Sequence, residues 1–188
     1  AHDVCIEIHA AALNRADLLQ RQGKYPSLKG CPPWMGLEVA GVVREAGAAV
    51  TKWRKGDRVC ALLGGGGYAE AVAVDEGMVM PIPGKLTFEE AASLPEAYAT
   101  CYLNLFREGG YRPGETLFFP AGASGLASVG IPMAKAFGAY VITSVLTDEI
   151  AEKIAPLQAD RVIVSAREDT AQVIREEAEK GHPLDVAI

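Results

Sequence analysis

The feature that most constrains the fold is a short apolar run that leads through a glycine-rich turn into a helix-length apolar segment. Residues 116–119 follow a Pro-Gly turn and are typical of a buried parallel strand. The turn reads Gly122-Ala-Ser-Gly125-Leu-Ala127, and the helical segment 126–137 ends at Gly138, a typical C-cap. A helix that starts at such a turn presents free N–H groups and partial positive charge, so the segment is suited to a dinucleotide pyrophosphate.

The glycine pattern of this turn is incomplete. If Gly122 is the first glycine of G-x-G-x-x-G, Ser124 occupies the middle position and Ala127 the last. Alanine is accepted at the last position, where the helix must pack closely on the strand. Serine is small but carries a Cβ atom that the turn must tolerate. From the turn alone, a dinucleotide site and an ordinary strand–helix connection both remain open.

The sequence after the turn favours a parallel sheet. Residues 140–144, 161–164 and 184–188 are strand-like, and residues 148–157 and 170–180 are helical. Strands and helices that alternate at these lengths are typical of a doubly wound α/β sheet. Because such a sheet would be left with an unpaired edge, we expect the chain to be part of a longer protein that continues at both ends.

The first half of the chain has a different character. Its strand-like segments are residues 3–12, 36–43, 57–63 and 68–74, with a short helix at 14–23 and a proline-rich loop at 25–34. Short strands separated by Gly and Pro turns predict a compact β-barrel up to about residue 83. Glycines at 36 and 41 predict close backbone contact or a bulge. The glycine run 64–67 lacks a lysine and precedes a strand, which indicates a flexible hairpin or barrel corner and excludes a P-loop.

A helical region connects the two halves. Thr87 and Glu90 form a capping-box signature, and the helical pattern continues through Pro95 to about residue 107. We place the domain boundary in this region. Residues 1–92 then form the first domain and residues 93–188 the second.

Composition excludes several classes of partner. The net charge is −6 and Lys and Arg do not cluster, so nucleic acid and anionic membranes are poor partners. No apolar run reaches membrane-spanning length, and no signal-peptide pattern opens the chain. The four cysteines are widely separated without a C-x-x-C motif, which predicts reduced thiols in a cytoplasmic protein.

Several separate motifs resemble, in their order, those of the medium-chain dehydrogenases/reductases. They are Leu-Asn-Arg-Ala-Asp-Leu at 13–18, Gly-Leu-Glu-Val-Ala-Gly-Val-Val at 36–43, Gly-Asp-Arg-Val at 56–59, and the segments 95–100 and 121–127. Together they make the whole chain similar to the zinc-free quinone oxidoreductase branch, the zeta-crystallin-like proteins. The resemblance implies a GroES-like β-barrel catalytic domain followed by a doubly wound Rossmann domain, both incomplete in this chain. It also implies an active site in the cleft between the domains and a homodimer.

The resemblance also bears on metal binding. Zinc-dependent relatives have a histidine where this chain has Leu37, and they have a catalytic cysteine after the first strand. A leucine side chain cannot ligate a metal, and the chain contains no lobe of four cysteines. We therefore expect no metal.

The chemistry that the resemblance implies is hydride transfer from NADPH to a quinone or another small conjugated carbonyl. Without a metal, the acceptor oxygen needs a hydrogen-bond donor. The resemblance places Tyr25 in this role and Asn14 beside the substrate or ribose. A tyrosine packed in a proline-rich loop and a simple helix N-cap are equally open readings. Glu38 is interpreted as a strand-edge carboxylate paired with a cation, and Arg15 and Asp17 as structural partners.

The resemblance further implies the residues that hold the cofactor. Thr100 would contact the nicotinamide amide, and the pyrophosphate would be wrapped by Gly122, Ala123, Ser124, Gly125, Leu126 and Ala127. The second strand of the sheet ends without an acid before Asp148, which favours NADPH over NADH. However, the family's phosphate-binding lysine and tyrosine correspond to Ile150 and Ser165. Candidates for the 2′-phosphate are then Ser144, Thr147 and Arg167, and NADH remains possible.

Two other functions remain open. An enoyl-thioester reductase of the same superfamily would need a basic entrance for the phosphoadenosine of coenzyme A, which the sequence does not show. A nucleotide-binding protein with a structural or regulatory role, as in the crystallins, would bind the cofactor without turnover. The sequence does not separate a working cofactor from an idle one.

Overall fold

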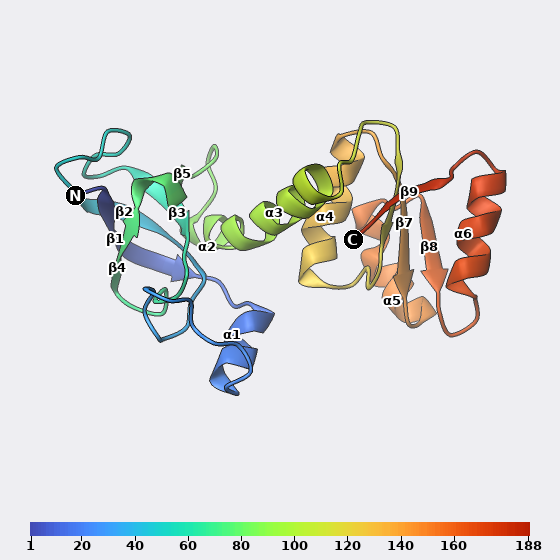
Figure 1. Cartoon of the computed structure of the whole chain (residues 1–188), viewed down its shortest axis with the longest axis horizontal. Coiled ribbons are helices and arrows are strands. Elements are labelled where there is room, and N and C mark those ends of the chain that lie inside the picture. The colour runs from blue at the N-terminus through green and yellow to red at the C-terminus, as the bar shows by residue number, and fades with distance from the viewer. The chain divides into compact units, whose positions relative to one another are not determined.

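A five-stranded antiparallel sheet forms the frame of the first half of the computed structural model, which describes residues 1–188 (Figure 1). Its strand order is β4-β1-β2-β3-β5. The strands are β1 (Asp3–Ala11), β2 (Glu38–Ala46), β3 (Arg58–Leu62), β4 (Ala71–Asp75) and β5 (Val79–Pro81). Inward-facing side chains such as Val4, Ile6, Val39 and Val59 form one buried cluster, since alternate residues of a strand share a face. The all-β organisation predicted for this part of the chain is confirmed.

Gly41 of β2 packs closely against the backbone of β1. A Cβ atom at this position would overlap the backbone carbonyl of Glu7 on β1. The pairing of β1 with β2 shifts register between Cys5 and Ile6 and again between Ile8 and Ala10. The expected close contact and bulge are therefore both present. At the first shift the extra residue is Arg44 of β2, the strand that carries the glycine, and at the second it is His9 of β1.

In the first half of the chain, backbone hydrogen bonds connect the loop after helix α1 (Arg15–Arg21) to the glycine run. Helix α1 follows β1, and the loop after it reaches the glycine run at 64–67. Gly66 N–H donates to the Trp34 carbonyl at 2.9 Å, and Gly67 N–H donates to the Gly36 carbonyl at 3.0 Å. The run is thus a packed corner, fixed by backbone hydrogen bonds, and not a freely flexible hairpin. A single turn of 3-10 helix, η1 (Glu76–Met78), connects β4 to β5.

The helical connection begins as predicted. Thr87 N–H donates to the Glu90 carboxylate at 2.8 Å, and Glu90 N–H donates to the Thr87 hydroxyl at 3.2 Å, which completes the capping box. The helical region is divided into three parts, α2 (Phe88–Ala92), α3 (Pro95–Tyr102) and a π-helical segment η2 (Leu103–Glu108). The chain separates into two compact units, Ala1–Glu96 and Ala97–Ile188.

The second unit contains a parallel sheet with strand order β8-β7-β6-β9. Its strands are β6 (Thr116–Phe119), β7 (Tyr140–Val145), β8 (Arg161–Val164) and β9 (Leu184–Ala187). Between them lie α4 (Gly125–Ala136), α5 (Asp148–Ile154) with the short η3 (Ala155–Leu157), and α6 (Thr170–Glu179). This order corresponds to strands 3-2-1-4 of the Rossmann fold, one half and the first strand of the other, and the predicted doubly wound sheet is confirmed.

The two faces of this sheet are covered by different helices (Figure 1). Leu117, Phe119 and Val141 pack in one buried cluster with residues of α4. Ile142 and Ile163 point to the other face and pack against α6. The direction of strand order reverses between β6 and β9, so the carboxyl ends of these strands are where an open sheet of this kind binds ligands. No helix of the structure combines the length and the hydrophobicity needed to cross a bilayer.

Glu177 of α6 gives the second unit a predicted acid sensitivity. Its buried carboxylate accepts hydrogen bonds from the Lys180 ammonium at 2.8 Å and the Tyr140 hydroxyl at 2.7 Å, and these lower the pKa of Glu177. A lowered pKa stabilises the fold above the ordinary value of 4.5, and this contribution is lost as the pH falls through the folded-state pKa. We expect Glu177→Gln to lower the melting temperature at neutral pH and to approach the parent protein in acid. Thermal melts of both proteins across this pH range test it, and an equal deficit at every pH would contradict it.

Candidate functional site

The glycine turn is held against the end of the neighbouring strand. Gly122 N–H donates to the Ser144 carbonyl of β7 at 2.8 Å. A Cβ atom at position 122 would overlap the side-chain hydroxyl of Thr143, which itself donates to the Phe119 carbonyl at 2.7 Å. Glycine is therefore required at position 122 so that the turn can lie on β7.

Ser124 and Ala127 fit the turn in different ways. Ser124 is the N-cap of α4, and its hydroxyl accepts a hydrogen bond from Ala127 N–H at 3.1 Å. The serine in the middle position of the motif thus satisfies one N–H group of the helix. Ala127 is buried in the same cluster as Leu117 and Phe119, as expected where a small residue lets the helix pack closely on the strand.

The first turn of α4 leaves room and donors for an anion. The backbone N–H groups of Ala123, Gly125 and Leu126 have no acceptor within the protein. A Cβ atom on Gly125 would meet no other atom within 4 Å, and the backbone of Gly125 is not left-handed. Neither packing nor backbone conformation requires a glycine there. Open space before three unpaired N–H groups at a helix N-terminus fits a pyrophosphate.

The residue in the left-handed conformation of this turn is Ala121, with φ of +55°. A side chain in this region costs about 1 kcal/mol relative to glycine. Sequence reasoning placed the first motif glycine one residue later and gave no signal for this strained alanine. Ala121 lines the pocket described next, so the strain lies at the candidate site.

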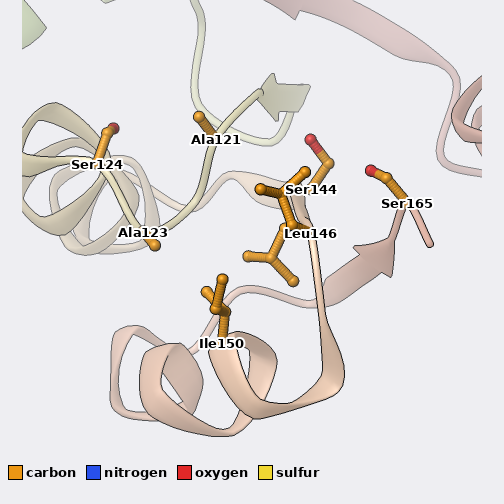
Figure 2. A pocket seen from close by; sticks show the side chains of 8 residues that line it. Ala121, Ala123, Ser124, Ser144, Leu146, Ile150 and Ser165 are labelled. Carbon is orange, nitrogen blue, oxygen red and sulfur yellow. The ribbon is translucent and has the colours of Figure 1, made fainter.

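A pocket of about 400 Å³ opens beside the turn, at the carboxyl ends of β6, β7 and β8 (Figure 2). In Figure 2, Ser144 and Ser165 lie toward one end of the pocket and Ile150 toward the other. The lining consists of Ala121, Ala123, Ser124, Ser144, Val145, Leu146, Ile150 and Ser165. Aliphatic walls with hydroxyl groups at one side suit the sugar and base of a nucleoside.

Two of the residues proposed to hold a 2′-phosphate lie outside the residues that line this pocket. The Thr147 hydroxyl caps α5 and accepts from Ile150 N–H at 3.4 Å. The Arg167 guanidinium is exposed and lies 3.0 Å from the Asp148 carboxylate and 3.6 Å from that of Glu168. The hydrogen bonds that Arg167 donates to the Asp148 carboxylate raise the pKa of Arg167. Of the three candidates, only Ser144 contributes to the pocket wall.

Thr100 lies on α3, close to the beginning of α4. Its carbonyl accepts a hydrogen bond from the Asn104 amide at 2.8 Å. The thiol of the next residue, Cys101, is 3.4 Å from the Leu126 carbonyl and donates to it. The structure therefore brings Thr100 near the glycine turn, although it does not line the pocket beside it. Its proposed contact with the nicotinamide amide stays a prediction.

In the first unit, Glu38 is a buried carboxylate with two hydrogen-bond donors. It is 2% exposed and accepts from the Asn14 side-chain amide at 2.8 Å and from Glu96 N–H at 2.8 Å. Burial raises the pKa of Glu38, and these two hydrogen bonds offset part of that effect. No cation pairs with it, so the interpretation as a strand-edge carboxylate beside a cation is wrong.

Asp17 is the second carboxylate that fixes Asn14. It accepts from Asn14 N–H at 2.8 Å and from Gly36 N–H at 3.0 Å, and it is 2% exposed. Its structural role is thus confirmed, but its partners are backbone groups and not Arg15. Asn14 stands at the N-cap position of α1, with its backbone held by Asp17 and its side chain by Glu38.

Two tyrosines lie in the loops of the first unit. Tyr25 is 39% exposed, and its hydroxyl has no hydrogen-bond partner in the protein. The Tyr68 hydroxyl donates to the Ala12 carbonyl at 3.3 Å. Burial and the neighbouring Asp17 carboxylate raise the pKa of Tyr68 to about 12. Sequence reasoning passed over Tyr68, whose only signal was its position directly after the glycine run.

No group of three or more His, Cys, Asp and Glu side chains is placed to hold a metal ion. Leu37, at the position where zinc-dependent relatives carry a histidine, is buried. Metal independence stays a prediction that rests on this leucine.

Comparison with known proteins finds several oxidoreductases to which the chain is similar. Residues 1–84 match the alcohol dehydrogenase GroES-like domain. The chain is 35% identical to the quinone oxidoreductase-like protein 2 homolog of Nematostella vectensis over 97% of its own length and 50% of that protein. The chain therefore spans about half the length of this curated relative.

Two solved structures share the fold. One is the Escherichia coli quinone oxidoreductase complexed with NADPH, with a TM-score of 0.81, 29% identity, and coverage of 95% of this chain and 55% of that one. The other is the CurK enoyl reductase, with a TM-score of 0.85, 26% identity, and coverage of 95% and 56%. These likenesses cover both units of the chain.

Proposed function

The chain belongs to the medium-chain dehydrogenase/reductase superfamily, and on that premise we propose that the protein transfers hydride from a nicotinamide cofactor to a quinone or another small conjugated carbonyl. Similarity to a quinone oxidoreductase that was solved with NADPH supports this assignment. The sequence-based expectation of a cytoplasmic homodimer is part of the same proposal, and sedimentation of the full-length protein tests the dimer.

The observation that carries the proposal is the open helix N-terminus at Gly125. Ala123, Gly125 and Leu126 offer three N–H groups without acceptors, and the missing Cβ of Gly125 leaves space in front of them. These groups would hold the pyrophosphate, and the pocket beside Ser144 and Ser165 would take the adjoining nucleoside. When bound, a reduced nicotinamide supplies the hydride, which the protein itself cannot provide.

Residues of the first unit would stabilise the negative charge that develops on the acceptor. As hydride reaches a carbonyl compound, negative charge develops on its oxygen, and a positioned donor stabilises it. The Tyr25 hydroxyl is free to donate because no protein group accepts from it. Asn14, held by Asp17 and Glu38, would orient the substrate. Leu37 gives this site no metal ligand, so we propose that the hydroxyl acts without zinc.

The test is turnover of an ortho-quinone by the full-length protein, followed by loss of nicotinamide fluorescence. We expect Tyr25→Phe to lower kcat/KM by about 100-fold, the effect of removing one donor from an oxyanion site. Tyr68→Phe, a matched change at the tyrosine already bonded to Ala12, is expected to have a much smaller effect. Unchanged kcat/KM in Tyr25→Phe would remove Tyr25 from the mechanism, and cofactor binding without any turnover would favour a structural or regulatory role.

A second candidate is an enoyl-thioester reductase, because the chain also shares its fold with the CurK enoyl reductase. Both reactions deliver hydride to a conjugated carbonyl, so the same cofactor site would serve either. Turnover of a crotonyl thioester, compared with an ortho-quinone at equal concentration, separates the two. A preference for the thioester in kcat/KM would replace the quinone assignment.

A further inference from the structure

The pocket beside the glycine turn has no charged side chain in its wall. Its eight lining residues are alanine, serine, valine, leucine or isoleucine (Figure 2). Rossmann sites choose between the two nicotinamide cofactors by charge: an acid binds the ribose 2′-hydroxyl of NADH, and an arginine accommodates the 2′-phosphate of NADPH. Here neither kind of group lines the pocket.

From this we infer that the protein binds NADH at least as tightly as NADPH. The inference rests on the proposed function and assigns the cofactor that the site accepts. A phosphate dianion placed against aliphatic walls loses hydration that two serine hydroxyls replace only in part. A neutral 2′-hydroxyl carries no such cost, since the Ser144 and Ser165 hydroxyls can both donate to it and accept from it.

The cations that flank the pocket are already paired. Arg167 follows Ser165 by two residues but is bound to Asp148. Lys153 follows Ile150 by one helical turn and is bound to Glu149 at 2.7 Å. To recruit either cation, a 2′-phosphate would compete with the carboxylate that holds it, and that carboxylate would then repel the phosphate.

Ile150 is the residue that leaves the pocket without a preference for NADPH over NADH. Its side chain lines the pocket from the first turn of α5, opposite the two serines in Figure 2. A lysine at this position would bring an ammonium group to the pocket while its aliphatic stem keeps the contacts of isoleucine. Methionine is the matched control, because it extends the side chain without adding charge.

The experiment measures binding of NADH and NADPH to the full-length protein by nicotinamide fluorescence, without substrate. We expect the Kd for NADPH to equal or exceed that for NADH, and Arg167→Ala to change the NADPH Kd by less than about twofold, as for an exposed ion pair. Ile150→Lys is expected to tighten NADPH at least about tenfold and to leave NADH unchanged, which corresponds to one favourable charge contact. Ile150→Met is expected to do neither.

An NADPH Kd measurably below the NADH Kd in the parent protein would overturn the inference, as would marked loss of NADPH binding in Arg167→Ala. These two measurements need no variant at Ile150, so they decide the matter even if Ile150→Lys fails to fold. Failure to bind either cofactor would instead reject the proposed function. A selectivity opposite to the inferred one would leave the proposed function standing.

Discussion

Gly125→Val is expected to raise the Kd for both nicotinamide cofactors by about 100-fold or more while leaving the fold intact. The Cβ of residue 125 would meet no protein atom within 4 Å, so a side chain at this position starts in open space. It would fill the space before the unpaired N–H groups of Ala123, Gly125 and Leu126. Loss of a helix-terminus anion site removes hydrogen bonds to a charged group, each worth about 1.5–3 kcal/mol.

Gly122→Ala is the matched control, since it lies in the same turn but has the opposite expected effect. Its methyl group would overlap the Thr143 hydroxyl and press on Ile154, so we expect a lower melting temperature. Thermal melts and cofactor titrations on both variants separate the two roles. If Gly125→Val melts like the parent protein and still binds cofactor, the glycine turn is not the cofactor site.

The second half of the chain could be predicted closely from its sequence. The central strands β6 and β7 are largely buried on both faces, which suits their apolar sequences, and the run at 161–164 matches β8 without error. Between the runs, Gly138 ends α4 in a left-handed conformation as expected. Pattern and structure agree here because local residue choice and burial favour the same elements.

Features that depend on contacts between distant residues could not be predicted in this way. β5 is only three residues long and pairs with β3, so it left no periodic signal. The strain at Ala121 arises where the turn must lie on β7. Arg167 follows the pocket residue Ser165 by two positions, but its guanidinium forms an ion pair with Asp148. Side-chain partners of this kind are decided by the assembled fold and not by spacing.

Glu38 is a buried carboxylate that accepts two hydrogen bonds, so its removal should destabilise the fold. We expect Glu38→Ala to lower the free energy of unfolding by about 3 kcal/mol, because it removes the carboxylate that accepts from the Asn14 amide and from Glu96 N–H in a buried place. Glu45→Ala, an exposed glutamate on the same strand with a 3.6 Å contact to Arg44, should change it by less than about 0.5 kcal/mol. Urea unfolding of the two variants makes the comparison, and equal losses would contradict it.

The pH dependence gives a second, independent test of Glu38, with a sign opposite to that of Glu177. Burial raises the pKa of Glu38, so its contribution to stability is complete below the ordinary value of 4.5 and declines as the pH rises through the folded-state pKa. The stability of the parent protein relative to Glu38→Gln should therefore fall with rising pH. Relative to Glu177→Gln it should rise, because hydrogen bonds from Lys180 and Tyr140 lower that pKa. A relative stability that rises with pH for Glu38 would mean that its two hydrogen bonds outweigh its burial, and that the charged carboxylate is the form that holds Asn14 in place.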